Sequence, residues 1–305
     1  MPNIPTYIGF DGGGSTSRFL IKRDSRRAEE IIYRRDLKYT DIGIDQSAKG
    51  FADCLNQILE VEINSIRSIC VSLSGASDVL SNNLFAQALR RELELPTMKL
   101  HIESDSTFTL NTAYPTTESG MLLIAGTGSV VMAKTRDGKQ RKIGGFGRLL
   151  GDEGSGHWIG VQALKHYLRV IEQTETKGIL AHRIENILNA SEASSHHELR
   201  KLLHDDVLHP SEFAPIVFDS LTDDGYAKEI LYDAGRFLMR EVEMLWEQVQ
   251  SECDPKLVLF GGIATQEFIS TYIREDCDEL GIACTILDAE LPLKRALSVA
   301  ESLSD

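Results

Sequence analysis

Short apolar runs alternate along this chain with longer segments of helical periodicity, and this pattern predicts an α/β fold. The apolar runs predict strands at residues 7–10, 18–22, 30–34, 68–73, 99–102, 121–125, 130–133, 139–143, 256–260 and 283–287. Apolar positions spaced three or four apart predict helices at residues 45–60, 82–93, 105–113, 155–171, 178–190, 197–204, 211–221, 225–250 and 266–280, with a last helix after Pro292. Residues 36–41 are expected to form a polar loop.

The first glycine-rich turn joins two strands. Asp11 ends the first strand and is followed by Gly12, Gly13, Gly14 and Ser15. Because a strand and not a helix follows, and no Gly-Lys-Ser/Thr is present, the turn is neither a P-loop nor a dinucleotide fingerprint. Its backbone N–H groups and hydroxyl can bind a phosphate, with Asp11 placed to hold hydrated Mg²⁺. A plain hairpin turn is the alternative.

Three more glycine-rich segments lie within residues 121–156. Their sequences are Gly126-Thr127-Gly128-Ser129, Gly144-Gly145-Phe146-Gly147 and Gly151-Asp152-Glu153-Gly154-Ser155. The third is expected to open a helix with the apolar face Trp158, Val161, Leu164, Leu168 and Ile171. So many glycines let backbone approach a ligand closely. The two acids suit a helix N-terminus and could equally bind hydroxyls or a hydrated metal, whereas simple hairpin turns are the alternative.

Two further strand ends are candidate ligand sites. Asp105 follows one strand and starts a helix, which is the usual position for a ligand-facing carboxylate in an α/β sheet, although a helix N-cap would look the same. Gly261-Gly262 follows the strand at 256–260 and can admit an adenine or ribose, or simply make a tight turn. Each half of the chain begins with strands joined by a Gly/Ser/Thr turn, so two such turns would clamp one polyphosphate between two hinged domains.

Composition excludes several classes of partner. The 305 residues carry 32 Lys and Arg against 46 Asp and Glu, and a net charge of −14 argues against nucleic acid. The five cysteines are widely spaced without a C-x-x-C pair, which indicates reduced thiols. We expect a cytoplasmic protein without a membrane partner, since residues 1–6 show no leader pattern and no apolar run approaches about 18 residues.

Taken together, the motifs resemble a known family. They are DGGGS at 11–15, Leu73-Ser74-Gly75, Ser104-Asp105, IAGTGS at 124–129, GGFG at 144–147 and GDEGS at 151–155, and they cover most of the chain. The chain resembles the N-acetylglucosamine kinases and their relatives in the BadF/BadG ATPase group, within the actin, sugar kinase and Hsp70 superfamily. The resemblance implies two ribonuclease-H-like domains around a cleft, at 1–115 with 290–305 and at 116–289. It also implies a homodimer, since members are often dimers.

The resemblance further implies transfer of the γ-phosphoryl group of ATP to the 6-hydroxyl of an amino sugar, with Mg²⁺. Asp105 would be the general base. ATP would contact Asp11, Gly12, Gly13, Gly14, Ser15, Thr127, Ala214 and Gly262. The sugar would contact Asp41, Ser74, Asp105, Gly128, Ser129, Gly144, Gly145, Phe146 and Asp152. Such chemistry needs positioning and charge neutralisation, and one carboxylate suffices as base.

The sequence departs from the family pattern at four positions. Asp41 stands where Asn is common, Phe146 replaces Trp, Ser15 replaces Thr, and Arg295 replaces Gly near the C-terminus. An ionised Asp41 accepts hydrogen bonds but cannot donate them, which favours a free amine. The acceptor stays open among N-acetylglucosamine, glucosamine, N-acetylmuramic acid and another hexose.

Two other functions compete with an amino-sugar kinase. A nucleotide- or sugar-binding regulator that has lost catalysis would share the fold, but the chain retains Asp11, Asp105 and Asp152. An ATPase activator of a dehydratase would need thiolates for an iron–sulfur cluster, and the sequence has no cysteine between Cys70 and Cys253.

Overall fold

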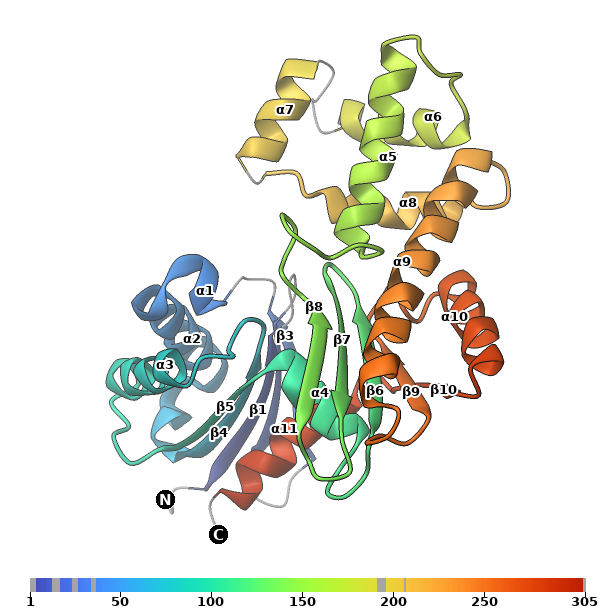
Figure 1. Cartoon of the computed structure of the whole chain (residues 1–305). Helices are drawn as coiled ribbons and strands as arrows, with labels where there is room; N and C mark the ends of the chain where they lie inside the picture. Colours follow the sequence, from blue (N-terminus) through green and yellow to red (C-terminus); the bar gives the residue numbers. More distant parts are fainter. Residues whose placement is uncertain are drawn as a thin grey trace. The chain divides into compact units, whose positions relative to one another are not determined.

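The computed structural model describes residues 4–12, 17–23, 27–33, 37–190, 196–205 and 207–303. The chain forms two compact units (Figure 1). The first unit joins Met1–Pro115 to Asp288–Asp305, and the second is the continuous segment Thr116–Leu287. Each unit has a five-stranded sheet and an apolar core of its own, so each is described by itself.

The sheet of the first unit has the strand order β3-β2-β1-β4-β5. Its strands are β1 (Thr6–Gly12), β2 (Ser17–Arg23), β3 (Glu29–Tyr33), β4 (Ile66–Leu73) and β5 (Lys99–Ser104). Its helices are α1 (Tyr39–Ile42), α2 (Ile44–Leu59), the 3₁₀ helix η1 (Glu60–Ser65), α3 (Val79–Glu92), α4 (Asp105–Ala113) and α11 (Leu291–Ser302). The pairs β1–β2 and β2–β3 are antiparallel, whereas β1–β4 and β4–β5 are parallel.

Four phenylalanines fill the core between this sheet and α2–α3. Phe10 and Phe19 face each other across the β1–β2 pair, with ring centroids 4.8 Å apart. Phe51 packs on both rings, and Phe85 closes the cluster 6.1 Å from Phe51. All four side chains are fully buried, and such tilted aromatic pairs add to the free energy gained by burial alone.

Helix α11 covers β1 and β4 although it comes from the far end of the sequence. A Cβ on Gly9 would lie 2.4 Å from the backbone nitrogen of Leu297, so only glycine lets the helix backbone come this close to β1. The Ser68 hydroxyl donates to the carbonyl of Ala300, and Lys22 pairs with Glu301. These contacts make the last helix part of the first unit.

The second unit repeats the same strand order. Its sheet runs β10-β9-β6-β7-β8, with β6 (Gly120–Ala125), β7 (Ser129–Lys134), β8 (Gln140–Gly144), β9 (Lys256–Phe260) and β10 (Ala283–Ile286). Its helices are α5 (Gly156–Ile171), α6 (Ile179–Ala190), α7 (His196–His204), the 3₁₀ helix η2 (Pro210–Phe213), α8 (Ala214–Asp219), α9 (Gly225–Val249) and α10 (Glu267–Glu279). Three antiparallel strands followed by two parallel ones, twice over, confirm the predicted pair of ribonuclease-H-like α/β domains.

The predicted elements are largely recovered within the described residues. The helix expected at 211–221 is the 3₁₀ helix η2 followed by the short helix α8, and the 3₁₀ helix η1 is not among the predicted elements. The expected loop at 36–41 contains the single-turn helix α1, and α3 begins three residues early because Asp78 caps it. Of the apolar face expected for α5, Leu164 is buried and Trp158 and Leu168 pack partly buried against the core, whereas Ile171 is exposed. The buried face also includes Ile159, Ala163 and Tyr167. Gly160 lets α5 pack closely against η2, because a Cβ there would lie 1.7 Å from the carbonyl oxygen of Pro210. Within the described ranges, no helix is long and apolar enough to cross a membrane.

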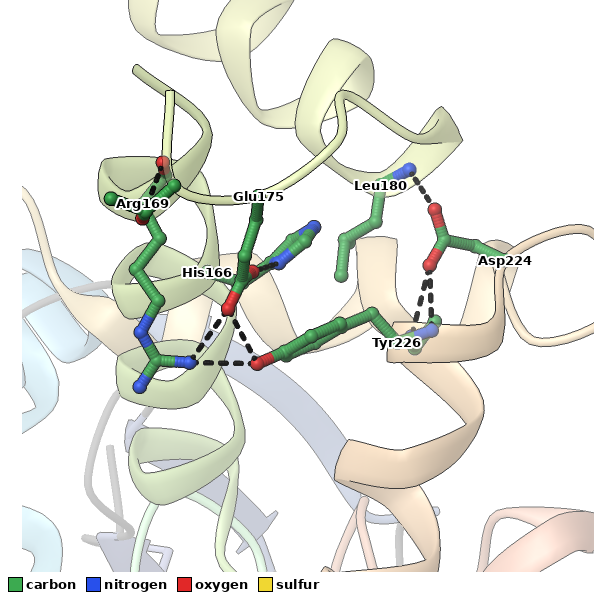
Figure 2. Close-up of polar contacts among 8 residues, drawn as sticks. His166, Arg169, Glu175, Leu180, Asp224 and Tyr226 are labelled. Carbon is green, nitrogen blue, oxygen red and sulfur yellow. Dashed lines mark hydrogen bonds and ion pairs between the residues drawn. The ribbon is translucent and has the colours of Figure 1, made fainter. Parts of the chain in front are cut away.

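A polar network joins α5, α9 and the start of α6 (Figure 2). His166 is buried and donates from Nδ1 to Glu175 Oε2 (2.5 Å), while its ring stacks on Tyr226 at 3.9 Å. Glu175 Oε1 also accepts from Arg169 (3.1 Å) and from the Tyr226 hydroxyl (3.1 Å). The contacts hold the segment after α5 against the first turn of α9.

Asp224 connects two helix starts in the same region. It is the N-cap of α9, and its Oδ1 accepts from the backbone N–H groups of Tyr226 (2.9 Å) and Ala227 (3.2 Å). Its Oδ2 accepts from the N–H of Leu180 in α6 (2.9 Å), as Figure 2 shows. One carboxylate therefore satisfies three N–H groups that neither helix can pair internally.

We predict that Asp224→Ala destabilises the protein by about 2 kcal/mol, because it removes a cap and leaves a buried N–H group unpaired. For a unit of this size the thermal midpoint should fall by roughly 4–8 °C. Glu247→Ala, at an exposed position of the same helix, is the control and should change the midpoint little. Equal midpoints for the two variants in a thermal scan would contradict the prediction.

Candidate functional site

Strand register brings the predicted residues of the first unit to one edge of its sheet. Gly12 of β1 lies beside Leu73 of β4, and Leu73 lies beside Ser104 of β5. Because these strands are parallel, Ser74 and Asp105 both follow at that edge. Neighbouring strands are about 4.8 Å apart, so β5 lies roughly 10 Å from β1.

Asp11 is held in place by two neighbours. Its Oδ2 accepts from Arg18 across the β1–β2 pair (3.2 Å), and its Oδ1 accepts from the Ser72 hydroxyl on β4 (3.3 Å). Arg18 also donates to the carbonyl of Ala289 (3.0 Å). The carboxylate is thus fixed at the sheet edge. The predicted phosphate-binding residues Gly13, Gly14 and Ser15 lie outside the described residues.

Asp11 fits a hydrated magnesium ion better than a directly coordinated one. Among the described residues, no group of three or more His, Cys, Asp or Glu side chains is arranged to hold a metal ion. Magnesium usually keeps several of its waters and binds one or two carboxylates together with substrate phosphates. An ionised carboxylate has about four lone-pair positions, so Asp11 can accept from metal-bound water in addition to its two protein donors.

Asp105 is the first residue of α4 and is half-buried. The N-cap of that helix is Ser104, whose hydroxyl oxygen accepts from the N–H of Thr107 (3.3 Å). Asp105 Oδ1 accepts from the N–H of Ser106 (2.7 Å). The alternative interpretation of Asp105 as the cap is therefore wrong, and its carboxylate stands at the positive end of the helix dipole.

The other predicted sugar-binding residues of the first unit form a second cluster. Ser74 donates its N–H to the carbonyl of Gly12 (3.0 Å). A Cβ on Gly75 would lie 2.9 Å from Thr40, so the turn after β4 touches α1. Asn82 on α3 accepts a hydrogen bond from the Tyr39 hydroxyl on α1 (2.7 Å), which helps to hold α1 in this position. Helix α1 also carries Asp41, whose side chain lies outside the described part of the structure.

The second unit also gathers its glycine-rich turns at one sheet edge. Ala125 pairs with Ser129, Val130 pairs with Gly144, and Gly261 follows the β9 residue that pairs with Ile124. Gly261 has a φ of +98°, and a Cβ there would lie 2.5 Å from the Ala125 carbonyl oxygen. That oxygen accepts from the N–H of Ile263 (2.9 Å), which fixes the turn containing Gly262.

The turn between β6 and β7 caps helix α5. The carbonyls of Gly126 and Thr127 accept from the N–H groups of Gly156 (2.8 Å) and His157 (3.1 Å). The Ser155 side chain accepts from the next N–H in the helix. The first N–H groups of α5 are therefore used inside the protein. Thr127 itself is exposed at the tip of the turn.

Asp152 does not cap α5 but binds the start of β7. It is buried, has a φ of +63°, and its Oδ1 accepts from the N–H of Ser129 (3.3 Å). Its Oδ2 lies 2.9 Å from where a Cβ on Gly128 would be. Burial raises the pKa of Asp152, and the Ser129 N–H partly opposes that rise. The Ser129 hydroxyl donates to the Glu153 carbonyl (3.0 Å). The N–H and the hydroxyl of Ser129 therefore both bond to the loop before α5.

Glu241 on α9 is a residue that the sequence pattern did not single out. Its carboxylate lies against Gly144, where a Cβ would be 2.7 and 2.8 Å from its two oxygens. Gly144 ends β8 with a φ of +74°. Burial, followed by the charges of Glu153 and Asp152, raises the pKa of Glu241 to about 7. Nothing local in the sequence could have found it, because 97 residues separate the two partners.

The remaining predicted residues have different surroundings. Gly145 (φ +65°) leads into Phe146, whose side chain is 75% exposed, and the same loop exposes Leu149 and Leu150. Ala214 is buried in the core of the second unit at the start of α8. At Gly262 a Cβ would meet nothing within 4 Å, so the site is open.

Arg295, a departure from the family pattern, packs its guanidinium 5.4 Å from the ring centroid of Phe108 on α4. Phe108 is buried one turn after Asp105, on the helix that Asp105 starts. Arg295 therefore contributes a cation–π contact to the packing of α11 on α4.

We predict that Gly144→Ala is more damaging than Gly138→Ala. Both residues have positive φ (+74° and +82°), so both changes cost about 1 kcal/mol of backbone strain. Only at Gly144 must the new methyl group also displace a carboxylate, which should add about 1–3 kcal/mol, whereas the space at Gly138 is empty. Urea unfolding of the two variants measures the difference, and equal stabilities would contradict the packing described for Glu241.

Comparison with known proteins finds a protein family whose model matches most of the chain. The model of the BadF/BadG/BcrA/BcrD ATPase family matches residues 8–287. A curated relative from Clostridium acetobutylicum, named N-acetylmuramic acid/N-acetylglucosamine kinase, is 27% identical over 265 residues, covering 83% of this chain and 82% of the relative. A second, from Dictyostelium discoideum and named N-acetyl-D-glucosamine kinase, is 28% identical over 182 residues, covering 56% of each.

Among solved structures, a protein from Chromobacterium violaceum described as a candidate N-acetylglucosamine kinase matches with a TM-score of 0.74. The match covers 98% of this chain and 100% of that one at 20% identity. At this level of identity the likeness concerns the fold.

Proposed function

The chain belongs to the BadF/BadG/BcrA/BcrD ATPase family, and from this premise we propose that it is an ATP-dependent sugar kinase that phosphorylates an amino sugar on its 6-hydroxyl group. Two curated relatives named as N-acetylglucosamine kinases support a sugar as the acceptor. The observation that carries the proposal is the edge of the first sheet, where Asp11 lies near the end of β1, and Ser74 and Asp105 follow the neighbouring parallel strands β4 and β5.

Asp105 is the proposed general base. A base must accept a proton from the attacking hydroxyl as the bond to phosphorus forms, and a carboxylate on a helix start is well placed for this. Its hydrogen bond from the Ser106 N–H fixes the orientation of the carboxylate. The new bond joins the sugar oxygen to the γ-phosphorus of ATP. The bond between that phosphorus and the β–γ bridging oxygen breaks, and ADP leaves with this oxygen and its electron pair.

The proposal assigns phosphate binding to the two glycine-rich hairpins. Thr127 is exposed at the tip of one hairpin, and Asp11 stands at the base of the other. A magnesium ion bound with ATP would neutralise charge on the phosphates, and Asp11 would hold it through water. The open position at Gly262 suits the nucleoside. The sugar is assigned to the loop of Gly144, Gly145 and Phe146, in which Phe146 is largely exposed.

The first test of this proposal is ADP release from Mg-ATP with one acceptor at a time. N-acetylglucosamine, glucosamine, N-acetylmuramic acid and glucose are the acceptors, and we expect turnover with at least one amino sugar. ³¹P and ¹³C NMR of the product would then locate the phosphate on the 6-oxygen. Purified protein that turns over none of them would contradict the proposal.

We predict that Asp105→Asn lowers kcat by about 10²–10⁴-fold, the usual contribution of a positioned base. The KM values for ATP and acceptor should change little, because the amide keeps the shape of the side chain. Asp53→Asn, at an exposed position on α2, is the matched control and should retain full kcat. Near-normal turnover by Asp105→Asn would remove Asp105 from the mechanism.

A further inference from the structure

Glu241 places a carboxylate with a buried oxygen inside the second unit. It projects from the middle of α9, which packs against β7 and β8, and its carboxylate fills the space left by the missing side chain of Gly144. Its Oε2 atom is buried and has no hydrogen-bond partner among the residues that the structure describes. A buried polar atom without a partner costs free energy, and the cost is far larger if the group is charged.

Two neighbouring carboxylates, Glu153 and Asp152, make ionisation of Glu241 still less favourable. Asp152 and Glu153, in the loop before α5, are the two charges that raise its pKa after burial itself. On β8, the cation of Lys142 lies beside Gly145, and on α5 His157 has a pKa lowered first by burial and then by Arg148. A lowered pKa favours the neutral form of His157. On α9 itself, Arg240 and Glu243 are the nearest charged residues in sequence, and both are exposed.

The loop in contact with Glu241 is rich in glycine and partly exposed. Gly144, Gly145 and Gly147 all have positive φ, and Phe146 between them is largely exposed. An ionised Glu241 would be repelled by Asp152 and Glu153 and drawn towards water, because burying an unpaired charge is costly. If its side chain leaves Gly144, the loop loses a packing contact that supplements the pairing of Gly144 with Val130.

We propose that Glu241 is a positioning residue for the acceptor: as a neutral carboxylic acid it holds the Gly144–Gly147 loop against β7, and loss of its proton weakens acceptor binding. The inference rests on the proposed function, because it takes this loop as part of the sugar site. It adds a residue outside that site and a dependence of acceptor binding on pH.

The test is the acceptor KM between pH 6 and pH 9, with N-acetylglucosamine or N-acetylmuramic acid, whose charges do not change in that range. For the unmodified protein we expect KM to rise about tenfold from pH 6 to pH 8, since a group that titrates near 7 is about nine-tenths ionised at pH 8. Glu241→Gln should keep the low KM of pH 6 throughout, and kcat and the KM for ATP should follow the same course in both proteins. Glu243→Gln is the control and should keep the rise.

The outcomes separate this inference from the proposed function. Turnover at pH 6 with an acceptor KM that does not rise, or that rises equally in Glu241→Gln, would overturn the inference alone. A high KM for Glu241→Gln at pH 6 would also overturn it, because the neutral amide should hold the loop. Absence of turnover with every acceptor at pH 6 would overturn the proposed function and this inference with it.

Thermal stability gives a second readout that needs no activity. The pKa of Glu241 is raised from 4.5 to about 7 on folding, so its stabilising contribution is full below pH 4.5 and is lost as pH rises through 7. The midpoint of Glu241→Gln should therefore exceed that of the unmodified protein at pH 8 by more than it does at pH 5. A difference that is independent of pH would show that Glu241 is ionised in the folded protein, and would overturn the inference.

Discussion

Parallel pairing of the first and fourth strands in each sheet is the constraint on which both candidate sites depend. In the first unit the β1–β4 and β4–β5 pairs set Gly12, Leu73 and Ser104 side by side, and in the second the β6–β9 pair sets Ile124 beside Phe260. Parallel strands place their carboxyl ends at one edge, so glycine turns and acids that are distant in sequence share that edge. The apolar cores beneath hold this register, since a shift by one residue would turn Phe10 and Phe19 away from the phenylalanine cluster and towards the face of the sheet that α11 covers.

Much of this architecture could be predicted from local pattern. The strand expected at 256–260 is β9 to the residue, because Lys256 and the four apolar residues after it stand between a proline and two glycines. Expected ligand residues such as Ser74 and Asp105 follow strands, and the end of a strand is visible in sequence. Where the buried face depends on a glycine, as at Gly160 in α5, hydrophobic periodicity misses it, because glycine carries no apolar side chain to count.

Side-chain partnerships between distant segments could not be predicted. Asp152 lies where the missing side chain of Gly128 leaves room, and Glu241 lies likewise at Gly144, 97 residues earlier. In the sequence those glycines look like turn residues or ligand-binding backbone, and in the structure they also make space for carboxylates. The ion pair between Asp11 and Arg18 follows from hairpin register, which depends on the length of the turn between them.

The position of α11 has a consequence for synthesis on the ribosome. The first unit includes Asp288–Asp305, and Gly9 of β1 leaves the space that the backbone at Leu297 occupies. The second unit is a single continuous segment that is fully translated before α11 emerges. Domains generally fold as units during translation. The second unit can therefore fold while the first unit, most of which is translated earlier, still lacks α11.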